Sequence, residues 1–244
     1  MNSSQGIIAD LRDEVATITI DSPGHLNAVN GAMMVQLAEA ITRAEEQKCV
    51  LLRLRANGQD FSIGREHFES PRAETGTISP ADWTQLAVDV FGAVANFSGI
   101  SIAEVRGSAF GFSAALALRL DLCVASQDVR FAFDEISKGF APRLVIGQML
   151  GLLDERTVMK LVVTGRAIDA DEAFARGLIS YLVPDDLLAT RTDALIEELL
   201  QLDADGLRNG KRYIHELRTV PVSDRGEFTT DRVHSDYDRG APRL

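Results

Sequence analysis

The sequence predicts an α/β fold followed by a helical C-terminal part. In the first half of the chain, short apolar segments alternate with amphipathic helical segments, a pattern typical of parallel strands joined by crossover helices. From Leu144 onward the pattern is helical. The 244 residues, 45% of them hydrophobic and 25% charged, suffice for one large domain with a full apolar core.

The first predicted elements are two strands with a helix between them. Residues 15–21 alternate apolar and polar side chains with a period of two, and residues 49–55 form a denser apolar run. Residues 31–47 place apolar side chains at helical spacing on one face. The next strand is expected at 100–106, followed by a helix that starts at Ala114.

The remaining predicted elements are two short strands and a series of helices. The strands cover residues 122–126 and 130–133. The helices cover residues 148–153, 157–163, 170–176, 187–202 and 204–218. A helical appendage of this kind often buries an apolar face against a partner subunit. Residues 70–80 and 233–244 are polar and contain glycine or proline, which predicts exposed loops.

Charge and hydropathy exclude several classes of partner. The net charge of −11 argues against nucleic acid, because counterion release requires clustered lysine and arginine. No apolar run is long enough to cross a bilayer, and no basic segment leads into an apolar stretch near the N-terminus. We therefore expect no membrane partner and a cytoplasmic location. Cys49 and Cys123 lie in apolar runs, which predicts buried thiols and no metal site.

Residues 107–121 form a turn of small residues that follows an apolar strand and opens an apolar helix. Backbone N–H groups that converge at a helix N-terminus can hold the oxygen of a polarised carbonyl. The turn is therefore a candidate oxyanion hole. No carboxylate lies between Gly107 and Asp121, so another segment must supply an acid or base.

Two further segments could complete such a site. Gly64 follows a predicted strand and allows the backbone to turn, so the next residue can point a second N–H into a cleft. Asp134 and Glu135 end the strand predicted at 130–133. Carboxylates in such a position are either solvated at the surface or act as the missing base.

Four segments resemble motifs of one family, in the same order along the chain. Pro23-Gly-His-Leu-Asn-Ala-Val29 resembles Pro-x-x-Leu-Asn-Ala-Leu, and Phe61-Ser-Ile-Gly-Arg-Glu66 resembles Phe-Ser-x-Gly-x-Asp. Residues 107–121 resemble Gly-x-Ala-x-Gly-Gly-Gly-x-Glu-Leu-Ala-x-x-x-Asp, and residues 164–173 resemble Thr-Gly-x-x-Ile-x-Ala-x-Glu-Ala. These are motifs of the crotonase superfamily, also called the enoyl-CoA hydratase/isomerase family.

The resemblance implies a fold more specific than the simple crossover pattern. It is a crotonase-type spiral of ββα turns with two roughly perpendicular sheets, expected over residues 1–186. A helical trimerisation region would follow over residues 187–244. The implied assembly is a homotrimer or a dimer of trimers.

The resemblance also implies the ligand and the site. Members bind acyl-CoA thioesters, so coenzyme A is part of the substrate and no tightly bound cofactor is expected. Residue by residue, the N–H groups of Arg65 and Phe112 would hold the thioester oxygen, and Glu135 would be the general acid/base. The other implied substrate-binding residues are His25, Leu26, Ile63, Gly64, Gly111, Ser113, Pro142, Arg143 and Lys211, the last at a position that contacts the CoA of a neighbouring subunit.

The chain departs from the family pattern in ways that favour one reaction. Hydratases of the family hold a water between two glutamates, and the first of these positions is Ala115 here. One remaining carboxylate can still move a proton, as in the family's double-bond isomerases. The sequence therefore favours single-base isomerisation over hydration.

Other departures leave alternatives open. Phe112 and Ser113 replace the usual Gly-Gly, and Ser113 is expected to cap the helix or, with His67 as base, to act as a nucleophile. Arg143 replaces a common glycine and could pair with Glu135 or bind a substrate carboxylate. Decarboxylation, C–C hydrolysis and a non-catalytic thioester-binding role are the rival hypotheses.

Overall fold

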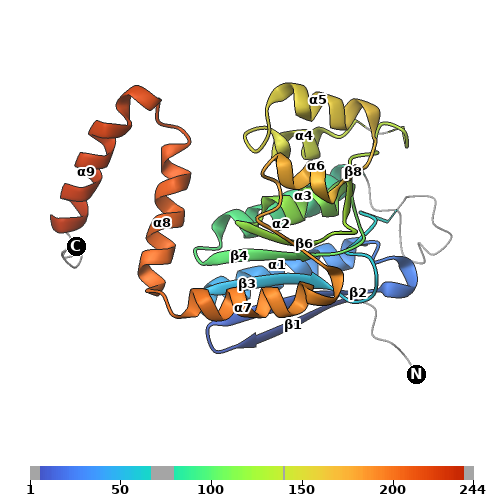
Figure 1. The fold of residues 1–244 in the computed structure, drawn as a ribbon, viewed down its shortest axis with the longest axis horizontal. Helices are drawn as coiled ribbons and strands as arrows, with labels where there is room; N and C mark the ends of the chain where they lie inside the picture. The colour runs from blue at the N-terminus through green and yellow to red at the C-terminus, as the bar shows by residue number, and fades with distance from the viewer. Residues whose placement is uncertain (1–5, 67–79, 140, 239–244) are drawn as a thin grey trace.

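The computed structural model describes residues 6–66, 80–139 and 141–238 (Figure 1). The larger of its two sheets has six strands in the order β1-β2-β3-β4-β6-β9. These are β1 (Gly6–Arg12), β2 (Val15–Asp21), β3 (Leu51–Ala56), β4 (Ile100–Val105), β6 (Leu122–Ser126) and β9 (Tyr181–Val183). β1 and β2 form an antiparallel hairpin and the other pairs are parallel. The predicted parallel pairing is confirmed, whereas β1 and β9 were not predicted.

The second sheet is small and lies next to the end of the first. Its strands are β5 (Ser108–Phe110), β7 (Arg130–Ala132) and β8 (Ile168–Asp169), in the order β5-β7-β8. β5 pairs with β7 in parallel, and β7 pairs with β8 antiparallel. Two sheets were expected, and the structure confirms them.

Helices occupy most of the remaining chain. They are α1 (Gly31–Glu46), α2 (Pro80–Asn96), α3 (Gly111–Arg119), α4 (Arg143–Met149), α5 (Glu155–Thr164), α6 (Ala170–Ala175), α7 (Leu188–Leu200), α8 (Ala204–Leu217) and α9 (Arg225–Asp238). Short 3-10 turns cover Pro23–His25, Asp185–Leu187 and Val222–Asp224. Four expectations fail here: α2 was not predicted, α3 begins before Ala114, α9 extends into the loop expected from Val233, and the helix expected at 148–153 is replaced by α4, which ends at Met149. The other loop was expected at residues 70–80, and residues 70–79 lie outside the described part of the chain.

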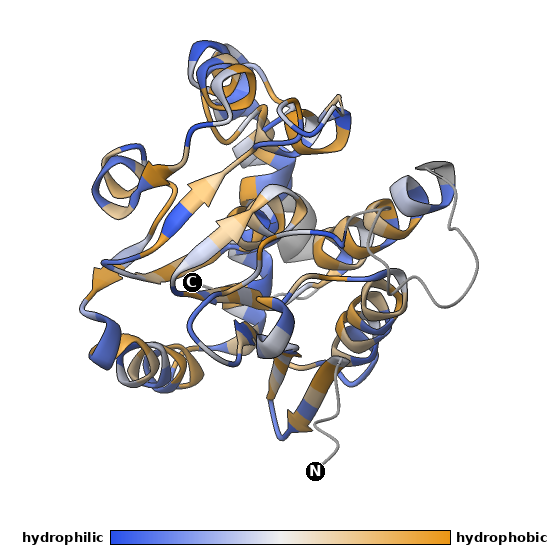
Figure 2. Ribbon diagram, turned by 90° about the vertical axis from the view of Figure 1, so that its right-hand side faces the viewer, coloured by the Kyte–Doolittle hydropathy of each residue, from blue (hydrophilic) through white to orange (hydrophobic). Residues whose placement is uncertain are grey.

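Helices cover both faces of the large sheet, which explains why its central strands are rich in apolar residues. α1, α2 and α3 bury the main apolar core, and α7 packs on β4 and β6 over a smaller cluster around Ile102 and Val124. β3 is therefore buried on both faces, as a central parallel strand requires. In Figure 2 the helices around the sheet carry both blue and orange segments, as amphipathic helices do.

Buried charges fasten α7 to the sheet. The guanidinium of Arg53 on β3 contacts Glu104 on β4 and donates to Asp193 on α7, 2.7 Å away. Arg53 and Glu104 are only 7% and 5% exposed. Water therefore stabilises neither charge, and each is stabilised by its partner.

A second buried ion pair fastens α8. The ammonium of Lys211 donates to the carbonyl oxygens of Phe97 and Gly99, at 2.7 and 2.8 Å, and to Asp121 at 2.8 Å. The same Asp121 oxygen accepts the N–H and O–H of Ser101. Beyond this anchor, α8 and α9 stand away from the rest of the molecule (Figure 1).

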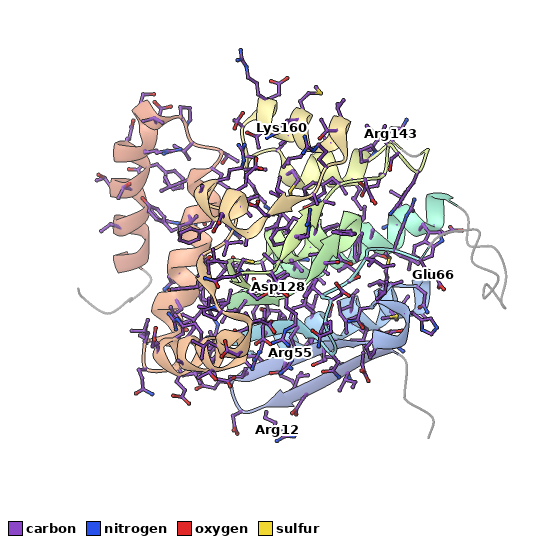
Figure 3. The ribbon with its side chains drawn as sticks, turned by 45° about the vertical axis from the view of Figure 1, so that its right-hand side comes forward. Arg12, Arg55, Glu66, Asp128, Arg143 and Lys160 are labelled. Atoms are coloured by element: carbon purple, nitrogen blue, oxygen red, sulfur yellow. The ribbon has the colours of Figure 1, made fainter. Side chains whose placement is uncertain are left out.

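We expect Lys211→Met to destabilise the protein by about 3 kcal/mol, because it leaves the buried Asp121 carboxylate without its cation. The free energy of unfolding, from urea denaturation, measures this. Lys160→Met is the control, since Lys160 is exposed and its pair with Glu172 lies at the surface (Figure 3). Equal losses in the two variants would contradict the anchoring role.

Candidate functional site

A cavity of about 260 Å³ lies where the N-terminus of α3 faces the segment that follows β3. Its walls come from five parts of the chain and from Met34 on α1. They are Ile63 to Arg65 after β3; Trp83, Thr84 and Ala87 on α2; Gly111 and Phe112 on α3; Asp134, Glu135 and Lys138 after β7; and Ala141 to Val145 around the start of α4.

The segment after β3 is held in an extended form by the segment before α1. Val29 donates its N–H to the Gly64 carbonyl at 2.8 Å, and Glu66 donates to the Val29 carbonyl at 2.9 Å. In a parallel pairing of this kind the intervening residue, Arg65, directs its own N–H to the opposite side. The backbone of Arg65 therefore faces away from Val29, on the side of the cavity that Arg65 lines.

Gly64 allows this segment to approach the end of β5. Its φ is +95°, and a Cβ there would lie 2.8 Å from the carbonyl oxygen of Phe110. On the other side of the contact, Ser62 donates to the Ser108 carbonyl at 2.9 Å and accepts from Phe110 at 3.0 Å. The two turns identified in the sequence are thus in direct contact.

The start of α3 forms the floor of the cavity. Gly111 has a φ of +52° and is the first residue of the helix, which makes Phe112 the second. At this position a backbone N–H has no acceptor within its own helix. The Phe112 ring is buried edge-on against Phe91, with a centroid separation of 5.6 Å.

Glu135 lies directly over this helix start. A Cβ added to Gly111 would be only 3.0 Å from Glu135 Oε1. Burial raises the pKa of Glu135, and the neighbouring Asp134 raises it further, while a backbone hydrogen bond, Lys138 and Arg65 lower it. Glu135 Oε2 is buried and has no hydrogen-bond partner among the described residues. Its neighbour Asp134 instead pairs with Lys138 at 2.9 Å.

The structure brings most of the predicted site residues to this one cavity. Those that line it are Ile63, Gly64, Arg65, Gly111, Phe112, Glu135, Pro142 and Arg143. Four others, His25, Leu26, Ser113 and Lys211, do not line it.

Ser113 does not cap α3. The N-cap residue is Phe110, and Ser113 lies inside the helix, wholly buried, with its Oγ 2.7 Å from Ser62 Oγ. The predicted capping role is therefore wrong, because the helix begins two residues earlier than Ser113. The bond to Ser62 ties the helix to the segment after β3. His67, its suggested base, lies outside the described residues.

His25 and Leu26 support the segment after β3 from behind. They lie at the end of the 3-10 turn Pro23–His25, and the Leu26 carbonyl accepts the N–H of Ile63 at 3.2 Å. The His25 ring is 3.3 Å from the Ser22 hydroxyl. Leu26 is therefore linked to the cavity through Ile63, which lines it.

Lys211 lines a different cavity, of about 370 Å³, between α8 and the start of β6. Its three N–H bonds already have three acceptors within the chain. A contact with CoA would have to break one of them. Arg143 does line the site, but the expected pair with Glu135 is absent: the Arg143 guanidinium makes no ion pair or hydrogen bond with the described residues.

The α2 side of the cavity was not predicted from the sequence. Trp83 and Ala87 on this helix face inward, and the Arg65 guanidinium carbon lies 5.9 Å from the centre of the Trp83 ring. The available signal was the helical spacing of Trp83, Ala87, Val90 and Val94, all of which are buried. Lys138 and Met34 were also missed.

The sequence profile of the enoyl-CoA hydratase/isomerase family matches residues 10–224. The chain belongs to this family. Its segments around Arg65, Phe112 and Glu135 lie within the match. Among the described residues, no group of three potential metal ligands occurs, and no helix has both the length and the apolar character needed to cross a bilayer.

Similar family proteins cover nearly the whole chain. A probable enoyl-CoA hydratase of Mycobacterium tuberculosis is 28% identical over 233 residues, which are 95% of this chain and 89% of that protein. A candidate enoyl-CoA hydratase of Thermobifida fusca, solved in complex with CoA, is 27% identical with a TM-score of 0.83, covering 97% of this chain and 95% of its own. A candidate enoyl-CoA hydratase/isomerase of Legionella pneumophila, at 21% identity and a TM-score of 0.87 over 96% of this chain and 92% of its own, shows the shared crotonase fold.

We expect Gly111→Ala to lower the free energy of unfolding by about 1–2 kcal/mol. The alanine must adopt a positive φ and its Cβ must displace the Glu135 carboxylate. Gly147→Ala is the matched control: this glycine is in α4 with no atom within 4 Å of its would-be Cβ, so the change should stabilise by about 0.5 kcal/mol. Urea denaturation measures both, and a neutral Gly111→Ala would contradict the contact.

Proposed function

We propose that the protein is a single-base enoyl-CoA isomerase, which moves the double bond of a 3-enoyl-CoA thioester to the 2,3 position. The observation that carries this is the position of Glu135, a carboxylate with a raised pKa, directly over the start of α3. Of the described residues that line the cavity, only Asp134 is also acidic, and it is paired with Lys138.

The proposed reaction needs one base and one oxyanion hole. Glu135 Oε2 removes a proton from the carbon next to the thioester, and the electron pair moves onto the thioester oxygen. The N–H groups of Arg65 and Phe112 hold this oxygen as charge gathers on it, which lowers the barrier selectively. The enolate then collapses, the double bond shifts, and Glu135 returns the proton to the fourth carbon. Atoms and electrons balance without water or a redox partner.

Two observations support an acyl-CoA substrate. The Thermobifida fusca relatives were solved with CoA and with acetoacetyl-CoA. In this chain the cavity has apolar walls, including Trp83, Ala87 and Val145, that suit an acyl chain.

The alternative reaction is hydration, because the relatives are named as enoyl-CoA hydratases. It requires a second carboxylate to hold the attacking water, and the corresponding residue, Ala115, is a fully buried alanine in α3. The product separates the two reactions, because isomerisation yields a 2-enoyl-CoA and hydration a 3-hydroxyacyl-CoA.

Trimeric assembly and a cytoplasmic location belong to the same proposal. α8 and α9 stand away from the body (Figure 1), and Ile214 and Val222 in this region are 61% and 77% exposed. Apolar side chains in such a position are suited to contact with a partner subunit.

Glu135→Gln should lower the rate of isomerisation about 1,000-fold, since a general base of this kind contributes about 100- to 10,000-fold. Exchange of the substrate α-proton with deuterated water, followed by NMR, measures the same step without waiting for product. Asp134→Asn is the control and should retain most of the exchange. If the unmodified protein shows no exchange either, the chain binds thioesters without turning them over.

Activity should depend on the ionisation of Glu135. The base acts as a carboxylate, so kcat/KM falls as the pH decreases through its pKa, which burial places above the usual value of about 4.3. Arg65→Gln removes a positive charge that lowers this pKa but keeps the backbone N–H. The acidic limb of the pH profile should therefore move to higher pH in Arg65→Gln. Arg156→Gln, at an exposed position on α5, should not move it.

A further inference from the structure

We propose that the acyl group of the substrate ends in a second carboxylate, which Arg143 binds at the end of the cavity remote from the thioester. This inference rests on the proposed function, because it assigns the substrate class of the same site. It would make Arg143 a specificity-determining residue for a dicarboxylic acyl thioester.

Arg143 has a defined place in the cavity wall. It is the first residue of α4 and follows Pro142, which is buried and has a φ of −80°. Both residues line the cavity together with Glu135 and Phe112. Arg143 lies on the same side of the molecule as Glu66, the residue after Arg65 (Figure 3).

The charge balance of the cavity leaves Arg143 without a counterion. Lys138 is paired with Asp134 at 2.9 Å. Arg65 lies over the ring of Trp83 and acts electrostatically on Glu135. The Arg143 guanidinium makes no hydrogen bond or ion pair with the described residues.

Arg143 is exposed, and other exposed arginines such as Arg43 and Arg156 also lack a side-chain partner among the described residues, but of these only Arg143 lines the cavity. Leu144 and Val145, which follow Arg143 in α4, line the same cavity. The planar guanidinium forms paired hydrogen bonds with a carboxylate or a phosphate, so its partner is expected to be the ligand.

The size of the cavity favours a carboxylate on the acyl group over a phosphate of CoA. At about 260 Å³ it is smaller than the about 300–1,000 Å³ typical of pockets for drug-sized ligands. It can therefore enclose a short acyl chain but not the much larger CoA. Since Glu135 and Arg143 line the same small space, a short chain that places its α-carbon at Glu135 extends toward Arg143.

Equilibrium binding of two saturated six-carbon CoA thioesters tests the proposal. One ends in a carboxylate and the other is its methyl ester, so the CoA part and the acyl length are the same. By isothermal titration calorimetry, the unmodified protein should bind the carboxylate about tenfold more tightly, and Arg143→Gln should abolish this preference. Arg156→Gln should retain it.

Two results would overturn the proposal. One is equal binding of the two thioesters by the unmodified protein. The other is an Arg143→Gln variant, shown to be folded by its circular dichroism, that weakens both thioesters equally, because Arg143 would then contact CoA. Saturated thioesters cannot be isomerised, so this preference is measured independently of whether Glu135 catalyses isomerisation.

Discussion

The candidate site depends on the close approach of two backbone turns. Gly64 lies against the carbonyl of Phe110, and Gly107 lies so close to the Gln59 carbonyl that a Cβ there would be 2.2 Å from its oxygen. Both glycines have positive φ, which other residues adopt only with strain. The side chain of Asn27 reinforces this contact, since it donates to the carbonyls of Asn57 and Asp60 at 2.7 Å each. The segment after β3 is thereby held at the N-terminus of α3.

This arrangement places a carboxylate next to backbone dipoles. Glu135 comes from the turn after β7, and β7 pairs with β5, the strand that leads into α3. The small sheet therefore sets the position of Glu135 over Gly111. Burial raises the pKa of Glu135, but Lys138 and Arg65 oppose this. The balance leaves a group that can both accept and return a proton.

The C-terminal helices are fastened by charges and not by the main apolar core. Asp193 on α7 meets Arg53, and Lys211 on α8 meets Asp121. Such pairs add little stability over apolar contacts, but they are costly to break, and they specify a single geometry. The position of α8 relative to the sheet therefore depends on Lys211, which binds Asp121 and the carbonyls of Phe97 and Gly99.

The sequence alone determined the family, the parallel pairing of the strands in the first half of the chain, and the residues Arg65, Phe112 and Glu135 as site candidates, because these lie in local motifs next to turns. The tertiary structure decided which candidates share a cavity. Ser113 meets Ser62, Lys211 meets Asp121, and Trp83 covers the site from a helix that was not predicted. These contacts join residues far apart along the chain, so they depend on how the whole chain packs and not on local pattern. The same reason explains why only the structure shows that Arg143 lines the cavity of Glu135 without an ion pair to it.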